Sequence, residues 1–186
     1  MQFSLTGRLL IATPSLDDPR FSRAIVFVCA HDEDHAMGVV VNRPVEALTL
    51  PDMLKNLGIE ATITVPPKPV LNGGPCDQER GFVLHTSDYF SEDATLMVGG
   101  GISLTATKDV LAAIANSQTP KRSVLALGYA GWSAGQLESE IQANAWIVGE
   151  GDHATVFGDN HDAKWLRALG RLGIDPGLLS PDIGHA

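Results

Sequence analysis

Residues 125–141 read LALGYAGWSAGQLESEI, and this stretch joins an apolar run to a helix-like pattern. The run at 124–129 has the length of a buried strand, whereas Leu137 and Ile141 are spaced to share one face of a helix. Between them the letters GWSAG spell Gly-x-Ser-x-Gly, the motif that places a nucleophilic serine on a strand-to-helix turn in many hydrolases. The stretch therefore predicts a strand, a turn and a helix, and it makes Ser133 the first residue to explain.

Two interpretations of Ser133 compete. A nucleophilic serine needs a histidine base, an acid that orients the base, and donors for the oxyanion. The sequence offers Asp152 or Asp159 as the acid, His153, His161 or His185 as the base, and the Asn72-Gly73-Gly74 turn as a source of donors. A capping box needs only Ser133 and Gln136, whose Ser-x-x-Gln spacing satisfies free N–H groups at a helix start. The pattern favours a cap at Ser133 and a helix over 133–143, with a serine hydrolase as the alternative.

The rest of the chain alternates short apolar runs with turn-rich segments. Strands are expected at 9–12, 24–30, 38–42, 70–71, 81–85, 95–98, 124–129, 146–148 and 154–157, and further helices at 49–57, around 110–114 and at 162–172. Apolar runs with little alternation are typical of strands covered on both faces. Because strands dominate the first half and helices are interspersed later, the pattern favours an α+β fold over a regular β-α-β alternation. We expect one domain over residues 1–186, with a mixed, mostly antiparallel sheet that curls toward a barrel and is flanked by short helices.

Composition limits the partners of the protein. The 186 residues include 13 Lys and Arg against 22 Asp and Glu, a formal net charge of −9. Nucleic-acid binding depends largely on neutralising phosphates, so direct DNA binding is not expected. Lys164, Arg167 and Arg171 share one face of the predicted last helix, and we expect that face to be solvated. No apolar run has the length of a membrane span and the N-terminus lacks a signal-peptide pattern, which favours a cytoplasmic protein.

The sequence gives little support for a metal or a cofactor. Cys29, His31 and His35 could share a strand face, but a structural zinc site usually takes four ligands and no second Cys/His pair lies nearby. A cytoplasmic location also argues against a disulfide between Cys29 and Cys76, so a buried thiol is expected at Cys29. The triple glycine at 99–101 lacks the Lys-Ser/Thr of a P-loop and is expected to be a turn. We therefore predict no metal and no cofactor.

Polar residues near strand ends and along one helix flank form a candidate binding set. Its members are Asn42, Arg43, Gly73, Gly74, Arg80, His85, Gln136, Glu140 and Asn144. Polar groups supported by glycines at strand ends are common in small-molecule pockets. The same residue types are also common in turns, loops and exposed helix positions, and His85 could be a histidine satisfied within a strand. Both interpretations remain open for this set.

Ordered sequence blocks extend through nearly the whole chain. They read LTGRLLIA at 5–12, DPRF at 18–21, GVVVNRP at 38–44, GGP at 73–75, RGFVLH at 80–85 and LGYAGW at 127–132, followed by GQLE at 135–138, EI at 140–141, Asn144 and Trp146. In these blocks the chain resembles the AlgH/YqgE-like proteins of bacteria. The resemblance implies an α/β fold whose sheet curls toward a barrel, and a role in regulating transcription that is connected with alginate production. It carries no catalytic residue to this chain, and the family pattern requires neither serine at position 133 nor cysteine at positions 29 and 76.

Three functions follow from these observations. The first is a regulatory protein that acts through a protein partner or a small ligand rather than by direct DNA binding. The second is a small serine hydrolase that uses Ser133. The third is a small-molecule-binding module built from the polar set. The sequence leaves the oligomeric state open.

Overall fold

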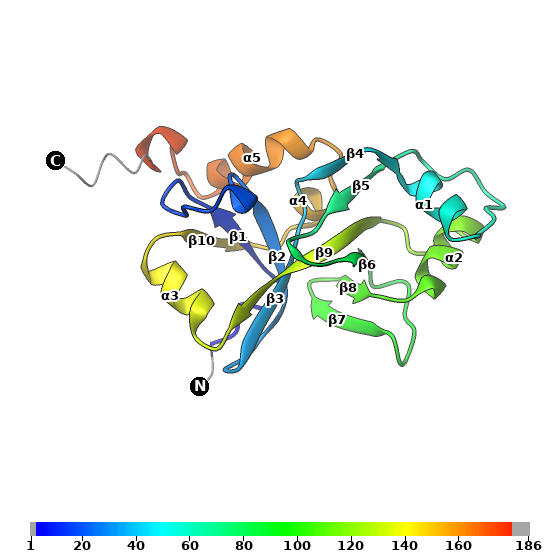
Figure 1. The fold of residues 1–186 in the computed structure, drawn as a ribbon, viewed down its shortest axis with the longest axis horizontal. Helices are drawn as coiled ribbons and strands as arrows, with labels where there is room; N and C mark the ends of the chain where they lie inside the picture. The colour runs from blue at the N-terminus through cyan, green and yellow to red at the C-terminus, as the bar shows by residue number, and fades with distance from the viewer. Residues whose placement is uncertain (1–2, 180–186) are drawn as a thin grey trace.

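The protein is built on ten strands, shown in Figure 1 as a computed structural model that describes residues 3–179. The strands are β1 (Arg8–Ala12), β2 (Ile25–His31), β3 (His35–Val40), β4 (Pro44–Thr49), β5 (Pro69–Asn72), β6 (Cys76–Thr86), β7 (Thr95–Gly99), β8 (Ile102–Thr105), β9 (Ser123–Ser133) and β10 (Trp146–Glu150). The α-helices are α1 (Leu50–Asn56), α2 (Lys108–Asn116), α3 (Gln136–Gln142), α4 (His153–Phe157) and α5 (Lys164–Arg171). Short 3₁₀ turns form η1 (Pro19–Phe21), η2 (His161–Ala163) and η3 (Pro176–Leu179).

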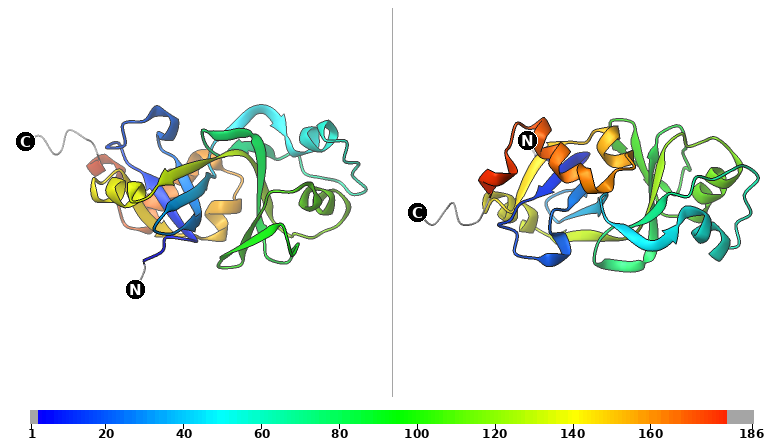
Figure 2. Two further views of the ribbon diagram at one scale, coloured as in Figure 1. Left: turned by 60° about the horizontal axis from the view of Figure 1, so that its bottom comes forward. Right: turned by 90° about the horizontal axis from the view of Figure 1, so that it is seen from above.

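The strands form one mostly antiparallel sheet in the order β10-β1-β2-β3-β9-β6-β8-β7, with β4 and β5 attached beside β9. Every pairing is antiparallel except that of β5 with β9. The sheet curls into a half-barrel, with α1 and α2 at one end and α3 at the other (Figure 2). The predicted α+β class with a mixed, curling sheet and short helices is confirmed.

Strand β9 connects the two halves of the sheet. Its first part pairs with β5 and β6, and its last part pairs with β3. Gly128 lies between the two parts with φ of 80°, where an added Cβ would come within 2.5 Å of the Gly74 carbonyl oxygen. An added Cβ at Gly73 would in turn lie 2.3 Å from the Gly128 carbonyl oxygen. Glycine is therefore required on both sides of this crossing, because the two backbones touch.

Alternate residues of the central strands are buried on both faces of the sheet. Leu9 and Phe27 pack in the interior of the half-barrel, together with residues of α4 and α5. Their neighbours Leu10 and Val26 pack on the opposite face, in a second cluster that includes Leu137 of α3. Burial on both faces explains why these strands read as continuous apolar runs instead of alternating patterns. Within residues 3–179, no helix combines the length and apolar character needed to cross a membrane.

One strand expected from the sequence is a helix, and one observed strand was not expected. Residues 154–157 lie in helix α4 and not in a strand, because the Asp152 side chain accepts the Thr155 N–H at 3.0 Å and starts a helix there. Strand β4 was not foreseen either, since its burial is partial and irregular. By contrast, Thr49 and Asp52 form the capping box at the start of α1, and the triple glycine at 99–101 is the turn between β7 and β8.

Candidate functional site

Ser133 is the last residue of β9 and does not cap α3. The helix begins at Gln136, and its N-cap is Gly135 in the left-handed conformation with φ of 74°. The Ser133 hydroxyl and backbone N–H both donate to Gln136 Oε1, at 3.2 and 3.0 Å. The predicted Ser133–Gln136 contact thus exists, but no helix N–H donates to the serine. The helix prediction over 133–143 began too early because Gly135 turns the chain two residues after Ser133.

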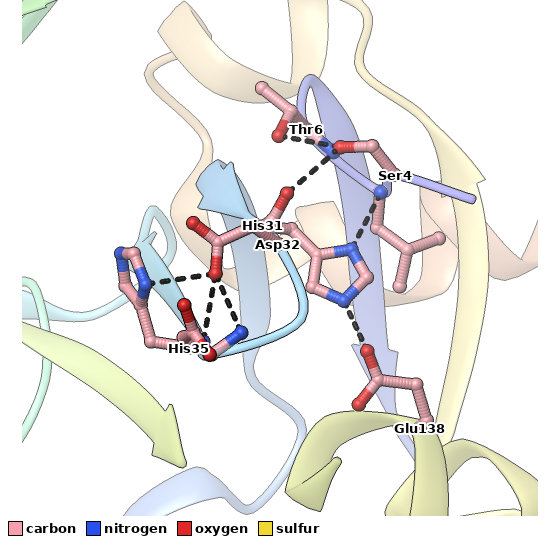
Figure 3. A network of polar contacts seen from close by, with 8 residues as sticks. Ser4, Thr6, His31, Asp32, His35 and Glu138 are labelled. Carbon is pink, nitrogen blue, oxygen red and sulfur yellow. Dashed lines mark hydrogen bonds and ion pairs between the residues drawn. The ribbon is translucent and has the colours of Figure 1, made fainter. Parts of the chain in front are cut away.

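The histidines considered as a base for Ser133 make other contacts. The ring of His153 donates from Nε2 to the Gly100 carbonyl oxygen at 2.7 Å, His161 is buried beside α5, and His185 lies outside the described residues. The cross-strand neighbour of Ser133 is His35, whose Nδ1 lies 3.1 Å from Asp32 Oδ1 (Figure 3). Among residues 3–179, Ser133 has no hydrogen bond to a histidine, and its hydroxyl is engaged by Gln136.

Side chains near Ser133 form a hydrogen-bonded cluster that joins β9, α3 and β10. This cluster, called the Glu140 cluster below, consists of Trp132, Gln136, Glu140 and Trp146. Glu140 Oε1 accepts the indole N–H of Trp132 at 3.1 Å and that of Trp146 at 3.0 Å. Glu140 Oε2 accepts from Gln136 Nε2 at 3.1 Å. The two indole rings meet edge to face, with centroids 6.0 Å apart. This arrangement gives residues 127–146, called the signature stretch below, a structural role. One carboxylate accepts the N–H groups of two largely buried tryptophans.

The Glu140 cluster and the neighbouring Asn144 also contact the loop that precedes β2. The ring of Phe21 packs edge-on against Trp146 at a centroid distance of 5.7 Å. The Thr13 hydroxyl donates to the carbonyl oxygen of Asn144 at 2.6 Å, and Asn144 itself has a left-handed φ of 62°. Residues 13–23, called the η1 loop below, are therefore fixed at both ends by the segment that follows α3.

A second polar network joins the N-terminal segment to α3 (Figure 3). The Leu5 N–H donates to His31 Nδ1 at 2.9 Å, so the ring proton of neutral His31 lies on Nε2 and is donated to the Glu138 carboxylate. The Ser4 hydroxyl donates to the His31 carbonyl oxygen at 3.2 Å. The hydrogen bond from His31 holds the pKa of Glu138 below its usual value. This network ties three segments together through a side chain that is almost fully buried.

The Cys29 thiol, considered as a metal ligand, lies in the interior of the protein. Cys29 is buried in the core, where burial raises the pKa of its thiol to about 12. The predicted buried thiol is confirmed, and such a thiol is unreactive at neutral pH because it is not ionised. Among the described residues, no three His, Cys, Asp or Glu side chains are arranged to hold a metal ion.

The η1 loop faces residues 42–44 and helix α5 across a groove. The groove consists of two adjoining pockets of about 510 and 700 Å³, which share Ser22, Arg23 and Trp165. We call the first the polar pocket and the second the apolar pocket. The polar pocket is also lined by Asn42, Arg43, Pro44, His161, Asp162 and Leu166. The apolar pocket is also lined by Ala12, Thr13, Pro14, Leu16, Asp17, Asp18, Pro19, Pro176 and Gly177.

Asn42 fixes the backbone on which the groove is built. Its side-chain oxygen accepts the Ile25 N–H and its amide donates to the Arg23 carbonyl oxygen, both at 2.9 Å. Arg23 is held with φ of 55°, a conformation that non-glycine residues rarely adopt. Its guanidinium carbon lies 4.9 Å from the ring centroid of Trp165. The Trp165 indole in turn donates to the Ala12 carbonyl oxygen at 2.8 Å, which fixes the floor of the groove.

Arg43 and Arg23 bring positive charge to the polar pocket. Arg43 Nη2 donates to the Ser22 carbonyl oxygen at 2.7 Å, and partial burial lowers the pKa of Arg43 without removing its charge. Within residues 3–179, neither arginine forms an ion pair. Asp162 is the acidic side chain among the residues that line this pocket. Asp17 and Asp18 line the adjoining apolar pocket, and Asp18 is paired with Arg20 at 2.7 Å. Burial lowers the pKa of His161, so its ring adds no charge at neutral pH.

The structure does not bring the nine residues of the candidate set into one pocket. Gly73 and Gly74 lie at the backbone crossing with β9, and Arg80 stacks over Phe82 at 5.2 Å. His85 is fully buried, with its ring nitrogens 2.8 Å from the Thr86 carbonyl oxygen and 2.7 Å from the Thr105 hydroxyl. Of the set, only Asn42 and Arg43 are among the residues that line the groove.

Sequence reasoning missed Arg23 and Trp165. Arg23 follows the DPRF block by two residues, but nothing in its letters indicated a left-handed backbone or a partner in the last helix. Trp165 lies within the helix expected at 162–172, and nothing in its position along the chain indicated a binding role. A tryptophan beside an arginine-bearing loop becomes informative only when the two segments are known to meet. That contact joins residues more than a hundred positions apart, which no local pattern encodes.

The expectation of a solvated basic face on the last helix is wrong for Lys164. Its ammonium group is buried and donates to the carbonyl oxygens of Val41 at 2.8 Å and Val156 at 3.3 Å. Burial lowers its pKa to about 8. Arg167 and Arg171 remain partly exposed and form ion pairs with Asp152. The three basic side chains of α5 therefore each have a partner within the fold.

Comparison with known proteins identifies the family of the chain. The sequence pattern that defines the AlgH-like family matches residues 9–177. The chain belongs to the AlgH-like family. UPF0301 proteins of Caulobacter vibrioides and Azorhizobium caulinodans are 51% and 52% identical to this AlgH-like protein, over 98% of the chain and 94% and 92% of their own lengths.

Two solved structures resemble this AlgH-like protein over most of their length. The solution structure of the AlgH protein from Pseudomonas aeruginosa has a TM-score of 0.77 at 38% identity, and both chains are covered completely. A crystal structure of a protein from Corynebacterium diphtheriae has a TM-score of 0.73 at 18% identity, with 96% of this chain and 92% of that one covered. The second likeness concerns the fold alone.

Proposed function

We propose that this AlgH-like protein is a regulatory protein of transcription that acts through a small ligand or a partner bound in the groove between the η1 loop and α5, and does not bind DNA directly. The observation that carries the proposal is the groove itself. Two of the blocks by which the chain resembles its family contribute to its two adjoining pockets: NRP at 42–44 lines the polar pocket, and Asp18 and Pro19 of DPRF line the apolar pocket. A preformed concave site with convergent polar groups is the usual form of a ligand site.

The signature stretch also contacts the η1 loop, which contributes residues to the groove. Glu140 holds Trp146, and Trp146 packs against Phe21 of the η1 loop. Trp146 and Glu140, which belong to the blocks quoted for the family resemblance, therefore help to hold the η1 loop, and other residues of that loop line the groove. A role for the signature in shaping a binding site accounts for its polar residues without assigning chemistry to Ser133.

The charge distribution supports indirect action on transcription. The chain has a net charge of −9, and two arginines of its last helix are paired with Asp152. A DNA-binding surface needs several free Lys or Arg side chains along one face, because contacts to phosphate supply most of the affinity. We therefore assign regulation to a ligand or partner that occupies the groove.

The proposal is tested by filling the groove. Ser22 lines both pockets and is exposed, so Ser22→Trp inserts a large side chain there. In a bacterium that carries this gene, transcript levels in a strain with Ser22→Trp are expected to match those of a deletion strain. The purified variant should keep the circular dichroism spectrum and Tm of the wild type.

A matched control is Ser139→Trp, on the exposed side of α3, which should behave as wild type. In parallel, fluorescence anisotropy with promoter DNA at low salt is expected to show no sequence-selective binding. Wild-type transcript levels in the Ser22→Trp strain would refute a role for the groove. Tight, sequence-selective DNA binding would refute the indirect mechanism.

A further inference from the structure

We infer that the groove recognises an organic oxyanion, a carboxylate or a phosphate, whose charged group is bound by Arg23 and Arg43 and whose apolar part extends along Trp165 into the apolar pocket. The inference rests on the proposed function and adds the chemical class of the ligand. It concerns residues that the sequence patterns did not single out together.

The first argument is the number of free donors. Each guanidinium carries five N–H groups. Among residues 3–179, the protein itself engages only one N–H of this pair of side chains, from Arg43 Nη2 to the Ser22 carbonyl oxygen. The remaining donors belong to two side chains that line the same pocket. Planar guanidinium groups match the oxygen spacing of carboxylates and phosphates, so an oxyanion is the chemistry that these donors fit.

The second argument is the effort with which Arg23 is held in place. A left-handed backbone at a non-glycine residue is unfavourable and persists only where the surroundings enforce it. Here Asn42 binds the Arg23 carbonyl oxygen and the Trp165 ring supports the guanidinium from one side. Strain of this kind at a pocket wall is typical of a side chain that is oriented for binding.

The third argument is local charge. The polar pocket is lined by two arginines and one carboxylate, that of Asp162, within a chain of net charge −9. Asp18 also faces Arg43, but it is paired with Arg20. An acidic protein that leaves two neighbouring arginines without an ion pair in its described residues has a site where an anion is attracted locally.

The shape of the groove indicates that the anion carries an apolar part. The apolar pocket shares Arg23 and Trp165 with the polar pocket and is lined by Pro14, Leu16, Pro19 and Pro176. Asp17 and Asp18 also line it, which favours placing the charged group of the ligand at the arginines and only its apolar part here. Its volume of about 700 Å³ exceeds what a bare carboxylate or phosphate fills. Inorganic phosphate should therefore bind more weakly than an aryl or alkyl oxyanion, because it leaves the apolar walls in water.

The three indole N–H signals make a direct test possible. Trp165 lies at the groove, whereas Trp132 donates to Glu140, does not contact the η1 loop through any contact described above, and serves as the internal control. We would titrate ¹⁵N-labelled protein with benzoate, phenyl phosphate, inorganic phosphate and the neutral analogue benzamide. Saturable shifts of the Trp165 indole are expected with benzoate or phenyl phosphate, and the stronger of the two identifies the preferred oxyanion.

Variants test the role of the arginines. Arg23→Gln and Arg43→Gln are each expected to weaken aryl-oxyanion binding by about tenfold or more, the effect of losing a hydrogen bond to a charged group. Arg122→Gln, an exposed arginine without a side-chain hydrogen bond in the described structure, should leave it unchanged. Arg43 also supports Ser22, so Arg23→Gln is the decisive variant if Arg43→Gln unfolds.

The inference fails if benzamide shifts Trp165 as strongly as benzoate, if no oxyanion gives a saturable shift in the millimolar range, or if Arg23→Gln binds like wild type. It would fail separately from the proposed function. Should no oxyanion bind while Ser22→Trp still reproduces the deletion strain, the groove acts through a partner or an uncharged ligand, and only the oxyanion assignment is overturned.

Discussion

Lys164 shows how one residue can change its meaning between sequence and structure. Its spacing with Arg167 and Arg171 indicated a solvated helix face, yet its ammonium group lies in the core between two carbonyl oxygens. The carbonyl oxygens of Val41 and Val156 compensate only part of the cost of burying the charge. The result is a folded-state pKa of about 8, below the ordinary value of 10.5.

This shift predicts a dependence of stability on pH. Between about pH 8 and pH 10 the unfolded chain keeps the Lys164 proton while the folded chain releases it, so the free energy of unfolding should rise with pH by about 2 kcal/mol from this group. Urea denaturation at several pH values measures the rise. In Lys164→Met the titrating group is absent, and the wild-type minus variant difference should carry the rise. A difference that stays constant over this range would contradict the assignment.

Ser133 yields a second prediction at the residue scale. Its hydroxyl donates to Gln136, and within the described residues no histidine accepts from it. An activated serine needs such a base, so a fluorophosphonate probe should leave the protein unlabelled by intact-mass spectrometry. Ser133→Ala is the control. Stoichiometric labelling of the wild type that disappears in Ser133→Ala would establish a nucleophile, with His35 and Asp32 across the sheet as the first partners to examine.

At the scale of elements, helix α3 connects several strands through its side chains. It has only seven residues, too few to be stable without packing. Its Glu140 joins the end of β9 to the start of β10 through two indoles, while Glu138 receives the His31 hydrogen bond from the end of β2. The short helix thereby links three strands and, through Trp146, the η1 loop.

Removing the Glu140 carboxylate should therefore cost more than an average surface substitution. Glu140→Ala leaves two largely buried indole N–H groups without an acceptor, and we expect the free energy of unfolding to fall by about 2–3 kcal/mol. Glu140→Gln keeps an acceptor oxygen and should lose less. Gln142→Ala, exposed on the same helix, is the matched control. Urea denaturation compares the variants. Equal free energies of unfolding for Glu140→Ala and Gln142→Ala would show that the Glu140 cluster does not contribute to stability.

At the scale of the whole molecule, the sequence was informative about elements and much less so about their meeting points. Apolar runs located β1, β2 and β3, and the helix expected at 49–57 corresponds to α1, because these features depend on neighbours in sequence. The groove depends on contacts between the η1 loop, residues 42–44 and α5, which lie far apart along the chain. Asn42 and Arg43 could be named from their position at a strand end, but Arg23 could not.

The path of β9 sets a limit on how this fold can change in length. Both its parts must present alternate side chains to fixed faces, and a shift of one residue exchanges the two faces. A single insertion or deletion between residues 124 and 133 would exchange the two faces of one half of the sheet relative to the other half. We expect length variation among AlgH-like chains to accumulate in the loops. The length of β9 should stay constant, because it fixes the register of both halves of the sheet at once.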